Sequence, residues 1–277
     1  MSKVICIVDN SAKPGSELKT EHGLSFWIET PQGNVLFDSA QTPEVLFHNL
    51  DILRLNITDL SALVLSHAHF DHTGGVGKVL EVKPELPTYG HKNIFTKRYH
   101  MLDGKTRQVG FSEENEISLQ KSKLTLSEES KQIVQGLWTT GHIKVRNEQL
   151  GSSPFLYIQK DGILSPDPYD DDLSLVLETR EGLAVICGCC HAGILNTLYH
   201  IKENFKGKIH TVIGGIHLVY ANEEYLDHIF EIIKAEFPAT RFLLNHCTGD
   251  KALERFEKDL GHLAMKFSAG RTVEFQD

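Results

Sequence analysis

The chain has 277 residues, of which 40% are hydrophobic and 23% are charged, and this composition excludes disordered, collagen-like and fibrous proteins. The formal net charge of −9 and the absence of a Lys/Arg run disfavour nucleic acid as a partner. The start of the chain lacks an apolar stretch of signal-peptide length, and no window approaches the roughly 18 apolar residues of a membrane span. We therefore expect a cytoplasmic protein that does not bind a membrane.

The first half of the chain begins with strands. The predicted strands are Val4–Val8, a hairpin of Ser25–Thr30 and Val35–Phe37 around a Pro-Gln-Gly-Asn turn, and the apolar run Ala62–Leu65. A helix is predicted from Pro43 to about Leu50, because Thr42 can cap it and proline suits its first turn. The stretch from about Gly90 to Pro168 is less regular, with strand-like pieces around Gln132–Trp138 and Phe155–Gln159, and we interpret it as an elaboration.

From Leu173 onward, strands and helices alternate. The predicted strands are Ser174–Thr179, Leu183–Cys187, His210–Ile213 and Phe242–Leu244, the predicted helices are Gly193–Asn204, Asn222–Phe237 and Asp250–Leu260, and a final hairpin follows. A strand-rich stretch followed by strand–helix units occurs in both halves. The sequence therefore predicts an α/β fold with two sheets face to face and helices outside. We expect one domain over residues 1–277, with the elaboration at about 90–168.

The strongest chemical signal lies directly after the Ala62–Leu65 strand. His67, His69, Asp71 and His72 place three imidazoles and a carboxylate within six residues, and burying them without partners would cost several kcal/mol. His67 and His69 can converge on one cation while Asp71 and His72 face a second. This ligand set suits zinc, manganese or iron, so we expect one or two divalent transition-metal ions, with zinc favoured. Two such ions would generate hydroxide and stabilise an oxyanion. The competing interpretation is a polar surface loop with coincidental histidines.

This loop and six other blocks carry a resemblance to a known family. The blocks are Val8–Asn10, Glu21–Ser25, Leu36–Asp38, Gly188–Gly193, Gly214–Leu218 and Asn245–Gly249. The sequence resembles the metallo-β-lactamase superfamily, whose signature is H-x-H-x-D-H after a strand. Within it, the sequence is similar to the branch of 7,8-dihydropterin-6-methyl-4-(β-D-ribofuranosyl)aminobenzene-5′-phosphate synthase. The resemblance implies an αββα sandwich of two mixed sheets with helices outside.

The remaining metal ligands must come from the second half. The resemblance makes His246 the last histidine ligand, with a hydrogen-bonding loop residue as the alternative. His191 follows the Leu183–Cys187 strand, at the same end of the sheet as the first loop if these strands are parallel. Many superfamily members have a bridging aspartate here, whereas this chain has Gly-Cys-Cys-His. Cys189 is therefore either a thiolate ligand or a small buried residue. The chain has an odd number of cysteines, five, and three of them (Cys187, Cys189 and Cys190) fall within four positions, which excludes a disulfide framework.

Two further histidines are candidates for the site. His142 resembles the third histidine of the superfamily, and it is either a ligand or a loop residue. His217 follows a Gly-Gly pair that lets backbone approach a ligand, so it is a substrate contact or proton carrier, a metal ligand, or a structural residue. We take Asp71 and His217 as the catalytic candidates. The other histidines, including His91, His100 and His228, are expected to be surface or packing residues.

Carboxylates complete the set of candidates. Asp38 is expected to accept hydrogen bonds and so to fix the segment from His67 to His72, which we call the metal loop. The alternative is that Asp38 is a turn residue. The resemblance makes Glu21 and His22 a substrate-binding pair, although polarity at a strand end explains them equally well. Asp170 to Asp172 are interpreted as a solvated acidic turn rather than a part of the cleft.

These residues predict a metal-dependent hydrolase with a dinuclear centre, acting on a phosphorylated or otherwise anionic small molecule. The resemblance offers a different enzyme, a synthase or transferase that joins a dihydropterin to an arylamine ribofuranosyl phosphate. A metal-dependent sensor without turnover is a third alternative. The substrate, the number of metal ions and the oligomeric state are left open by the sequence.

Overall fold

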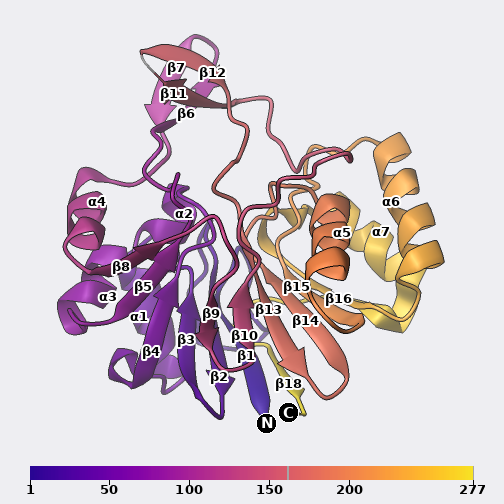
Figure 1. The fold of residues 1–277 in the computed structure, drawn as a ribbon, viewed down its shortest axis with the longest axis horizontal. Helices are drawn as coiled ribbons and strands as arrows, with labels where there is room; N and C mark the ends of the chain where they lie inside the picture. Colours follow the sequence, from indigo (N-terminus) through magenta and orange to yellow (C-terminus); the bar gives the residue numbers. More distant parts are fainter. Residues whose placement is uncertain (161, 277) are drawn as a thin grey trace.

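The computed structural model describes residues 1–160 and 162–276, and two large sheets lie face to face in the middle of the molecule (Figure 1). In order, the first sheet contains β18 (Thr272–Phe275), β1 (Ser2–Val8), β2 (Ser25–Thr30), β3 (Gly33–Phe37), β4 (Leu60–Val64), β5 (Pro87–Gly90) and β8 (Lys123–Leu126). The second contains β17 (Ala264–Lys266), β16 (Arg241–Leu244), β15 (Ile209–Gly214), β14 (Gly182–Cys187), β13 (Ser174–Thr179), β10 (Leu137–Thr139) and β9 (Gln132–Val134).

Helices cover the outer face of each sheet. The first sheet is covered by α1 (Pro43–Ile52), α3 (Val76–Val82) and α4 (Glu113–Gln120), and the second by α5 (Ile194–Asn204), α6 (Glu223–Glu236) and α7 (Asp250–Leu260). Thr42 caps α1 as expected, because its side chain accepts a hydrogen bond from Val45 N. Short helical turns lie at α2 (Phe70–Thr73), η1 (Ile57–Asp59), η2 (His246–Thr248) and η3 (Gly261–Leu263).

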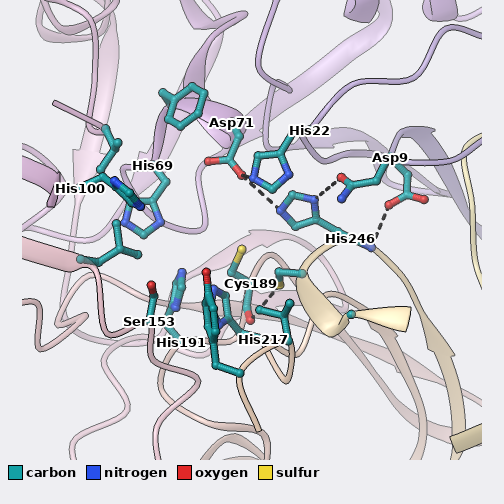
Figure 2. A pocket seen from close by; sticks show the side chains of 18 of the residues that line it. Asp9, His22, His69, Asp71, His100, Ser153, Cys189, His191, His217 and His246 are labelled. Atoms are coloured by element: carbon teal, nitrogen blue, oxygen red, sulfur yellow. Dashed lines mark hydrogen bonds and ion pairs between the residues drawn. The ribbon is translucent and has the colours of Figure 1, made fainter. Parts of the chain in front are cut away.

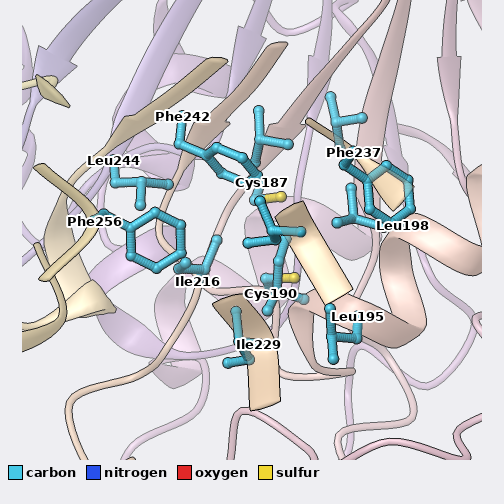
Figure 3. Close-up of a cluster of buried hydrophobic side chains, with 14 of the residues drawn as sticks. Cys187, Cys190, Leu195, Leu198, Ile216, Ile229, Phe237, Phe242, Leu244 and Phe256 are labelled. Carbon is cyan, nitrogen blue, oxygen red and sulfur yellow. The ribbon is translucent and has the colours of Figure 1, made fainter. Parts of the chain in front are cut away.

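Apolar side chains fill three layers between these elements. Between the sheets, Phe26 and Phe37 of the first sheet belong to one buried cluster with Ile186 of the second. A second cluster lies between the first sheet and its helices, and a third lies between the second sheet and α5 to α7. Figure 3 shows the third cluster, in which Cys187 and Cys190 lie among aliphatic and aromatic side chains. The predicted αββα sandwich is therefore confirmed.

The prediction of a final hairpin is wrong. β17 pairs in parallel with β16 of the second sheet, whereas β18 pairs antiparallel with β1 of the first. The chain thus crosses from one sheet to the other at its end. Apolar alternation predicts a strand but carries no information about its partner, so it does not reveal that these two successive strands belong to different sheets.

The irregular middle of the chain contributes to both core sheets and forms a third. Its strands are β6 (Arg98–Leu102), β7 (Lys105–Gln108), β11 (Leu156–Lys160) and β12 (Ile163–Pro166), in the order β12-β11-β6-β7. We call these four strands the lobe. The lobe projects from the open end of the sandwich (Figure 1). The expectation of one domain with an elaboration at about 90–168 stays a prediction, and residues 161 and 277 lie outside the described residues.

Parallel pairing brings several loops to the end of the sandwich beneath the lobe. β4 is parallel to β3 and β5 in the first sheet, and β14, β15 and β16 are parallel in the second. The loops after β4, β14, β15 and β16 therefore meet there. No helix among residues 1–160 and 162–276 is long and apolar enough to cross a membrane.

Candidate metal centre

The loop after β4 is buried beneath the lobe. His67, His69, Asp71 and His72 are each at most 6% exposed, although all four side chains are polar. Backbone in the left-handed region is concentrated around them, with φ of 60° at Asp38, 42° at His217 and 50° at His246. Non-glycine residues adopt this region at a cost that the surrounding structure must offset, and such strain is typical of functional sites.

Asp38, at the end of β3, organises the loop. Its carboxylate accepts hydrogen bonds from Ser66 N and Ser66 Oγ, each at 2.7 Å, and from His72 Nδ1 at 2.6 Å. The side chain of Asp38 is fully buried. Gly188 is required here because a Cβ at this position would collide with Ser66. The position of Asp38 thus agrees with the expected bracing role, and in the neutral ring it leaves the lone pair of His72 on Nε2, 3.1 Å from Cys189 Sγ.

Three ligand atoms, from Asp71, His72 and His246, form a triangle, and Figure 2 shows the Asp71 and His246 side chains pointing toward each other. His246 Nε2 lies 3.2 Å from His72 Nε2 and 3.3 Å from Asp71 Oδ2, and His72 Nε2 lies 3.6 Å from Asp71 Oδ2. His246 Nδ1 donates to Asn10 Oδ1 at 2.9 Å, so its Nε2 also carries a lone pair. A tetrahedral zinc ion with bonds of about 2.1 Å separates its ligand atoms by about 3.4 Å. The spacing of the triangle therefore fits a metal ion, which would take the place of the protons that these groups otherwise share.

A second group of imidazoles lies beside the first. His67 Nε2 is 2.9 Å from His69 Nδ1, and the ring centroid of His191 lies 5.0 Å from each of these two rings. His191 Nδ1 donates to Gly151 O at 2.6 Å, which leaves its buried Nε2 with a lone pair and no partner among the described residues. A buried acceptor without a partner is costly, and a metal ion would satisfy it.

Cys189 lies between the two groups. Its Sγ is 3.1 Å from His72 Nε2, and it falls within 4.8 Å of the ligand atoms of His67 and His191 and also of His72 and His246. Burial raises the pKa of the Cys189 thiol, so only a nearby cation would favour the thiolate. The sulfur thus stands where one ligand could serve both metal positions.

The pKa values of the imidazoles follow from burial and from neighbouring charges. Burial holds the pKa of His67, His69 and His191 well below the usual value, so these rings are neutral and able to bind a metal. Burial also opposes a charge on His72, but Asp38 and Asp71 outweigh it and raise the His72 pKa. Burial alone would raise the pKa of Asp71, and the surrounding histidines instead lower it well below its usual range.

The interpretation of Asp170 to Asp172 as a solvated turn is wrong for two of the three residues. Asp171 is buried and accepts a hydrogen bond from Ala68 N at 2.9 Å, between two candidate ligands. Asp172 is also buried and accepts from Ala192 N at 2.9 Å, next to His191. Burial raises the pKa of Asp171 to about 7 and that of Asp172 to about 6. Three consecutive aspartates in a sequence do not reveal that backbone amides from two other loops, at Ala68 and Ala192, donate hydrogen bonds to two of them.

The other candidates separate into residues inside and outside the pocket. His22 Nε2 lies 3.4 Å from Asp71 Oδ2, and His22 and His217 both line the pocket. The ring of His217 lies 4.3 Å from that of His191, and burial lowers its pKa to about 4. Glu21 does not line the pocket, because its carboxylate accepts from Gln41 N and Thr42 N, each at 2.9 Å.

His142 lies outside the pocket. Its Nδ1 is 3.2 Å from His91 Nε2 and 2.8 Å from Asp170 O, so it forms a separate cluster with His91 and Glu128. The structure therefore places His191, and not His142, beside His67 and His69. His91 is fully buried, in agreement with its expected packing role.

The sequence did not indicate several residues in or around the pocket, most of them from the elaboration. Tyr169 stacks on His191 with ring centroids 4.2 Å apart, while Arg98 forms buried ion pairs with Asp167 and Asp171. His100, which was expected to be a surface or packing residue, lines the pocket together with Arg107. These residues reach the metal loop through strand pairs and ion pairs between distant segments of the chain, and no local sequence motif indicates them.

Comparisons with known proteins agree with this geometry. Residues 18–181 match the family described as the metallo-beta-lactamase superfamily, and the chain belongs to that superfamily. Over 99% of its length it is 29% identical to 7,8-dihydropterin-6-methyl-4-(beta-D-ribofuranosyl)-aminobenzene-5′-phosphate synthase of Methanocaldococcus jannaschii, covering 96% of that protein. It is 31% identical to the uncharacterized protein MJ0448 of the same organism, over 91% of this chain and 93% of that protein. The crystal structure of Tm1679, a metal-dependent hydrolase of the beta-lactamase superfamily, is similar over the full length of both chains, with a TM-score of 0.86 and 25% identity.

Proposed function

We propose that the protein is a metal-dependent hydrolase with a dinuclear centre that acts on a phosphorylated or otherwise anionic small molecule. The observation that carries this proposal is the pair of adjacent groups of candidate ligand atoms, with Cys189 between them. Zinc is the favoured ion, because histidine, carboxylate and thiolate are its usual ligands, and manganese or iron would suit a site without the sulfur.

Each ligand has a stated role in this proposal. His67, His69 and His191 would hold one ion, and Asp71, His72 and His246 would hold the other, with Cys189 available to both. When bound, such ions supply Lewis acidity and activate water at neutral pH. Asp38, Asn10 and Gly151 O hold three of the rings through Nδ1, so each Nε2 keeps its lone pair.

The pocket supplies the remaining contacts. It encloses about 580 Å³, which suits a small organic substrate rather than a macromolecule. His217 is neutral at pH 7 because its pKa is about 4, and its Nδ1 has no partner among the described residues. We assign His217 to hydrogen bonding with the substrate, with exchange of a proton there as the alternative. His22, which also lines the pocket, is a second candidate substrate contact.

A second candidate function is a synthase that joins a dihydropterin to an arylamine ribofuranosyl phosphate. The similarity to the synthase of Methanocaldococcus jannaschii over 99% of this chain favours it. The same metal site would then bind the leaving group of a transfer reaction. The two candidates differ in whether water or an arylamine is the nucleophile.

Metal analysis and two activity assays test both candidates. We expect one or two transition-metal ions per chain, and metal-dependent cleavage of bis(4-nitrophenyl) phosphate by the zinc- or manganese-loaded protein. Absence of metal and of cleavage would overturn the hydrolase. Coupling of a dihydropterin to the arylamine ribofuranosyl phosphate, without hydrolysis of either, would support the synthase instead.

The role of His217 has its own test. His217→Ala is expected to lower kcat with unchanged metal content, because the side chain contacts substrate and not metal. The matched control is His228→Ala, on the solvent-facing side of α6 and paired with Glu148 at 2.8 Å, which should change neither. Loss of metal from the His217 variant would make it a ligand, and unchanged kinetics would reduce it to a structural residue.

A further inference from the structure

The lobe presents one row of side chains to the pocket. Leu156 of β11 pairs with His100 of β6, and His100 pairs in turn with Arg107 of β7. Residues paired across neighbouring strands project from the same face of a sheet. All three side chains line the pocket that holds the candidate metal centre, and Figure 2 shows His100 on the same side of it as His69. The lobe is therefore one wall of this pocket.

This wall is held rigidly against the metal loop. Phe70 N donates to Val109 O at 2.9 Å, and Val109 N donates to Arg98 O at 2.9 Å. The buried guanidinium of Arg98 donates to Asp167 at 2.9 Å and to Asp171 at 2.5 Å, and Asp171 in turn accepts from the metal loop. The row on the lobe thus has a fixed position relative to the ligand atoms.

Arg107, at the end of the row, carries a charge without a partner. Its guanidinium lies 5.4 Å from the ring centroid of Phe70, and it forms no hydrogen bond or ion pair with residues 1–160 or 162–276. The carboxylates that line the pocket are already engaged. Asp9 accepts from Ser11 and His246 N, Asp71 belongs to the metal triangle, and Asp250 pairs with Lys266. A guanidinium offers paired donors that match the oxygens of a phosphate or carboxylate.

A series of rings connects the lobe to the metal centre. The centroid of Phe155 lies 5.7 Å from that of His100 and 6.0 Å from that of Tyr220. The ring of Tyr220 lies 6.1 Å from His217, which is 4.3 Å from His191. The rings of His100, Tyr220, His217 and His191 line the pocket and form a wall against which a flat ligand can pack, and Phe155 supports His100 and Tyr220 without lining the pocket. An aromatic substrate would therefore extend from the metals toward the lobe.

We propose that Arg107 and the row beside it form an oxyanion subsite, which binds a phosphate or carboxylate group of the substrate remote from the metals. The flat ring that bears this group packs along the aromatic wall. The assignment of the reacting end of the substrate to the metals rests on the proposed hydrolase function. The subsite itself depends only on the residues of the lobe. Arg107 is a specificity residue in this proposal and takes no part in bond cleavage.

Three matched ligands test the subsite in the zinc-loaded protein. Adenosine, adenosine 5′-monophosphate and adenosine 5′-carboxylic acid share a flat ring and differ in the oxyanion, and calorimetry measures each Kd. In the wild type we expect the monophosphate to bind at least about tenfold more tightly than adenosine. Arg107→Ala should remove about tenfold of affinity for the anionic ligands and leave adenosine unchanged. Arg107→Lys should restore part of it, because the charge returns without the paired donors.

Lys105→Ala is the control, because it removes the same charge from the same strand outside the pocket. It should leave all three affinities unchanged. The subsite would be overturned if Lys105→Ala weakened binding of the anionic ligands as much as Arg107→Ala does, because the overall charge of the protein would then explain the effect. It would also be overturned if Arg107→Ala still bound the anionic ligands more tightly than adenosine by the wild-type factor, because the anion would then bind at the metals. An equal loss for both anions indicates a general oxyanion site, and a loss for the monophosphate alone indicates a phosphate site. If the metal-loaded wild type does not hydrolyse bis(4-nitrophenyl) phosphate but Arg107→Ala still weakens binding of the anionic ligands, the proposed hydrolase function is overturned and the subsite is supported.

Discussion

The metal centre and the lobe hold their polar groups in opposite ways. At the candidate metal centre, imidazoles and carboxylates from four loops are buried, and His72, His191 and His246 each have a partner at Nδ1 that orients the ring. On the lobe, β7 and β12 are exposed along their whole length, and Arg98 alone is deeply buried among the residues of its four strands. Under the proposed function, the chemistry depends on a buried network, whereas substrate selection depends on an exposed sheet with one buried anchor.

The largest effect should come from removing a ligand of the metal centre. His69→Ala and His246→Ala are each expected to abolish turnover and to reduce metal affinity by more than the roughly 10–100-fold that follows loss of an outer partner. Metal content and kcat measured on one preparation check this, with His228→Ala as the control. Full metal content in the His246 variant would show that this residue is not the last ligand.

The anchor of the lobe should give the next largest effect. Arg98→Met leaves Asp167 and Asp171 buried without their cation, and loss of one partner from a buried pair costs about 3–5 kcal/mol. Urea unfolding of the metal-loaded protein measures this loss. Arg107→Ala on the neighbouring exposed strand should change stability by less than about 0.5 kcal/mol. Equal stabilities of the two variants would contradict the contrast between anchor and surface.

Asp38 tests whether the fixed tautomers matter. Asp38→Asn keeps the size of the side chain and tolerates the left-handed backbone, but it removes the charge that His72 Nδ1 and Ser66 face. We expect metal affinity to fall by about 10–100-fold, with the fold retained. Competition with a chelator of known affinity measures the change, and circular dichroism checks the fold. An unchanged affinity would mean that the ring is oriented by packing alone.

The smallest effect concerns pH. Burial raises the pKa of Asp171 to about 7, so the folded protein retains a proton that the unfolded chain loses near pH 4. The stabilising contribution of this proton is complete below about pH 4 and is lost as the pH rises to about 7. Asp171→Asn lacks the titrating group, so its free energy of unfolding should fall less between pH 5 and 7 than that of the wild type. Asp170→Asn, at a half-exposed neighbour, should keep the wild-type slope.

The two regions also differ in how well the sequence predicts them. The metal loop is a compact motif, His191 follows a recognisable strand, and the family resemblance adds His246. The structure brings the side chains of these six candidate ligands to one end of the sandwich, and their role as ligands stays a prediction. The lobe depends on pairing between segments about 50 residues apart, and period-two patterns do not specify partners. Sequence patterns do not specify tertiary partners, and for the same reason the prediction of a final hairpin and the prediction that Asp171 is exposed to solvent are wrong.

The hydrogen bond from Ala68 N to Asp171 sets a condition on exchanging the lobe between relatives. A chimera that replaced only residues 98–108 and 156–166 would exchange Arg98 but keep its partners Asp167 and Asp171, which lie just beyond the last strand of the lobe. The incoming sheet would then arrive without its anchor, and the metal loop would keep a buried carboxylate without its cation. The smallest unit that can be grafted with its geometry intact therefore contains Asp167 and Asp171 as well as the four strands of the lobe.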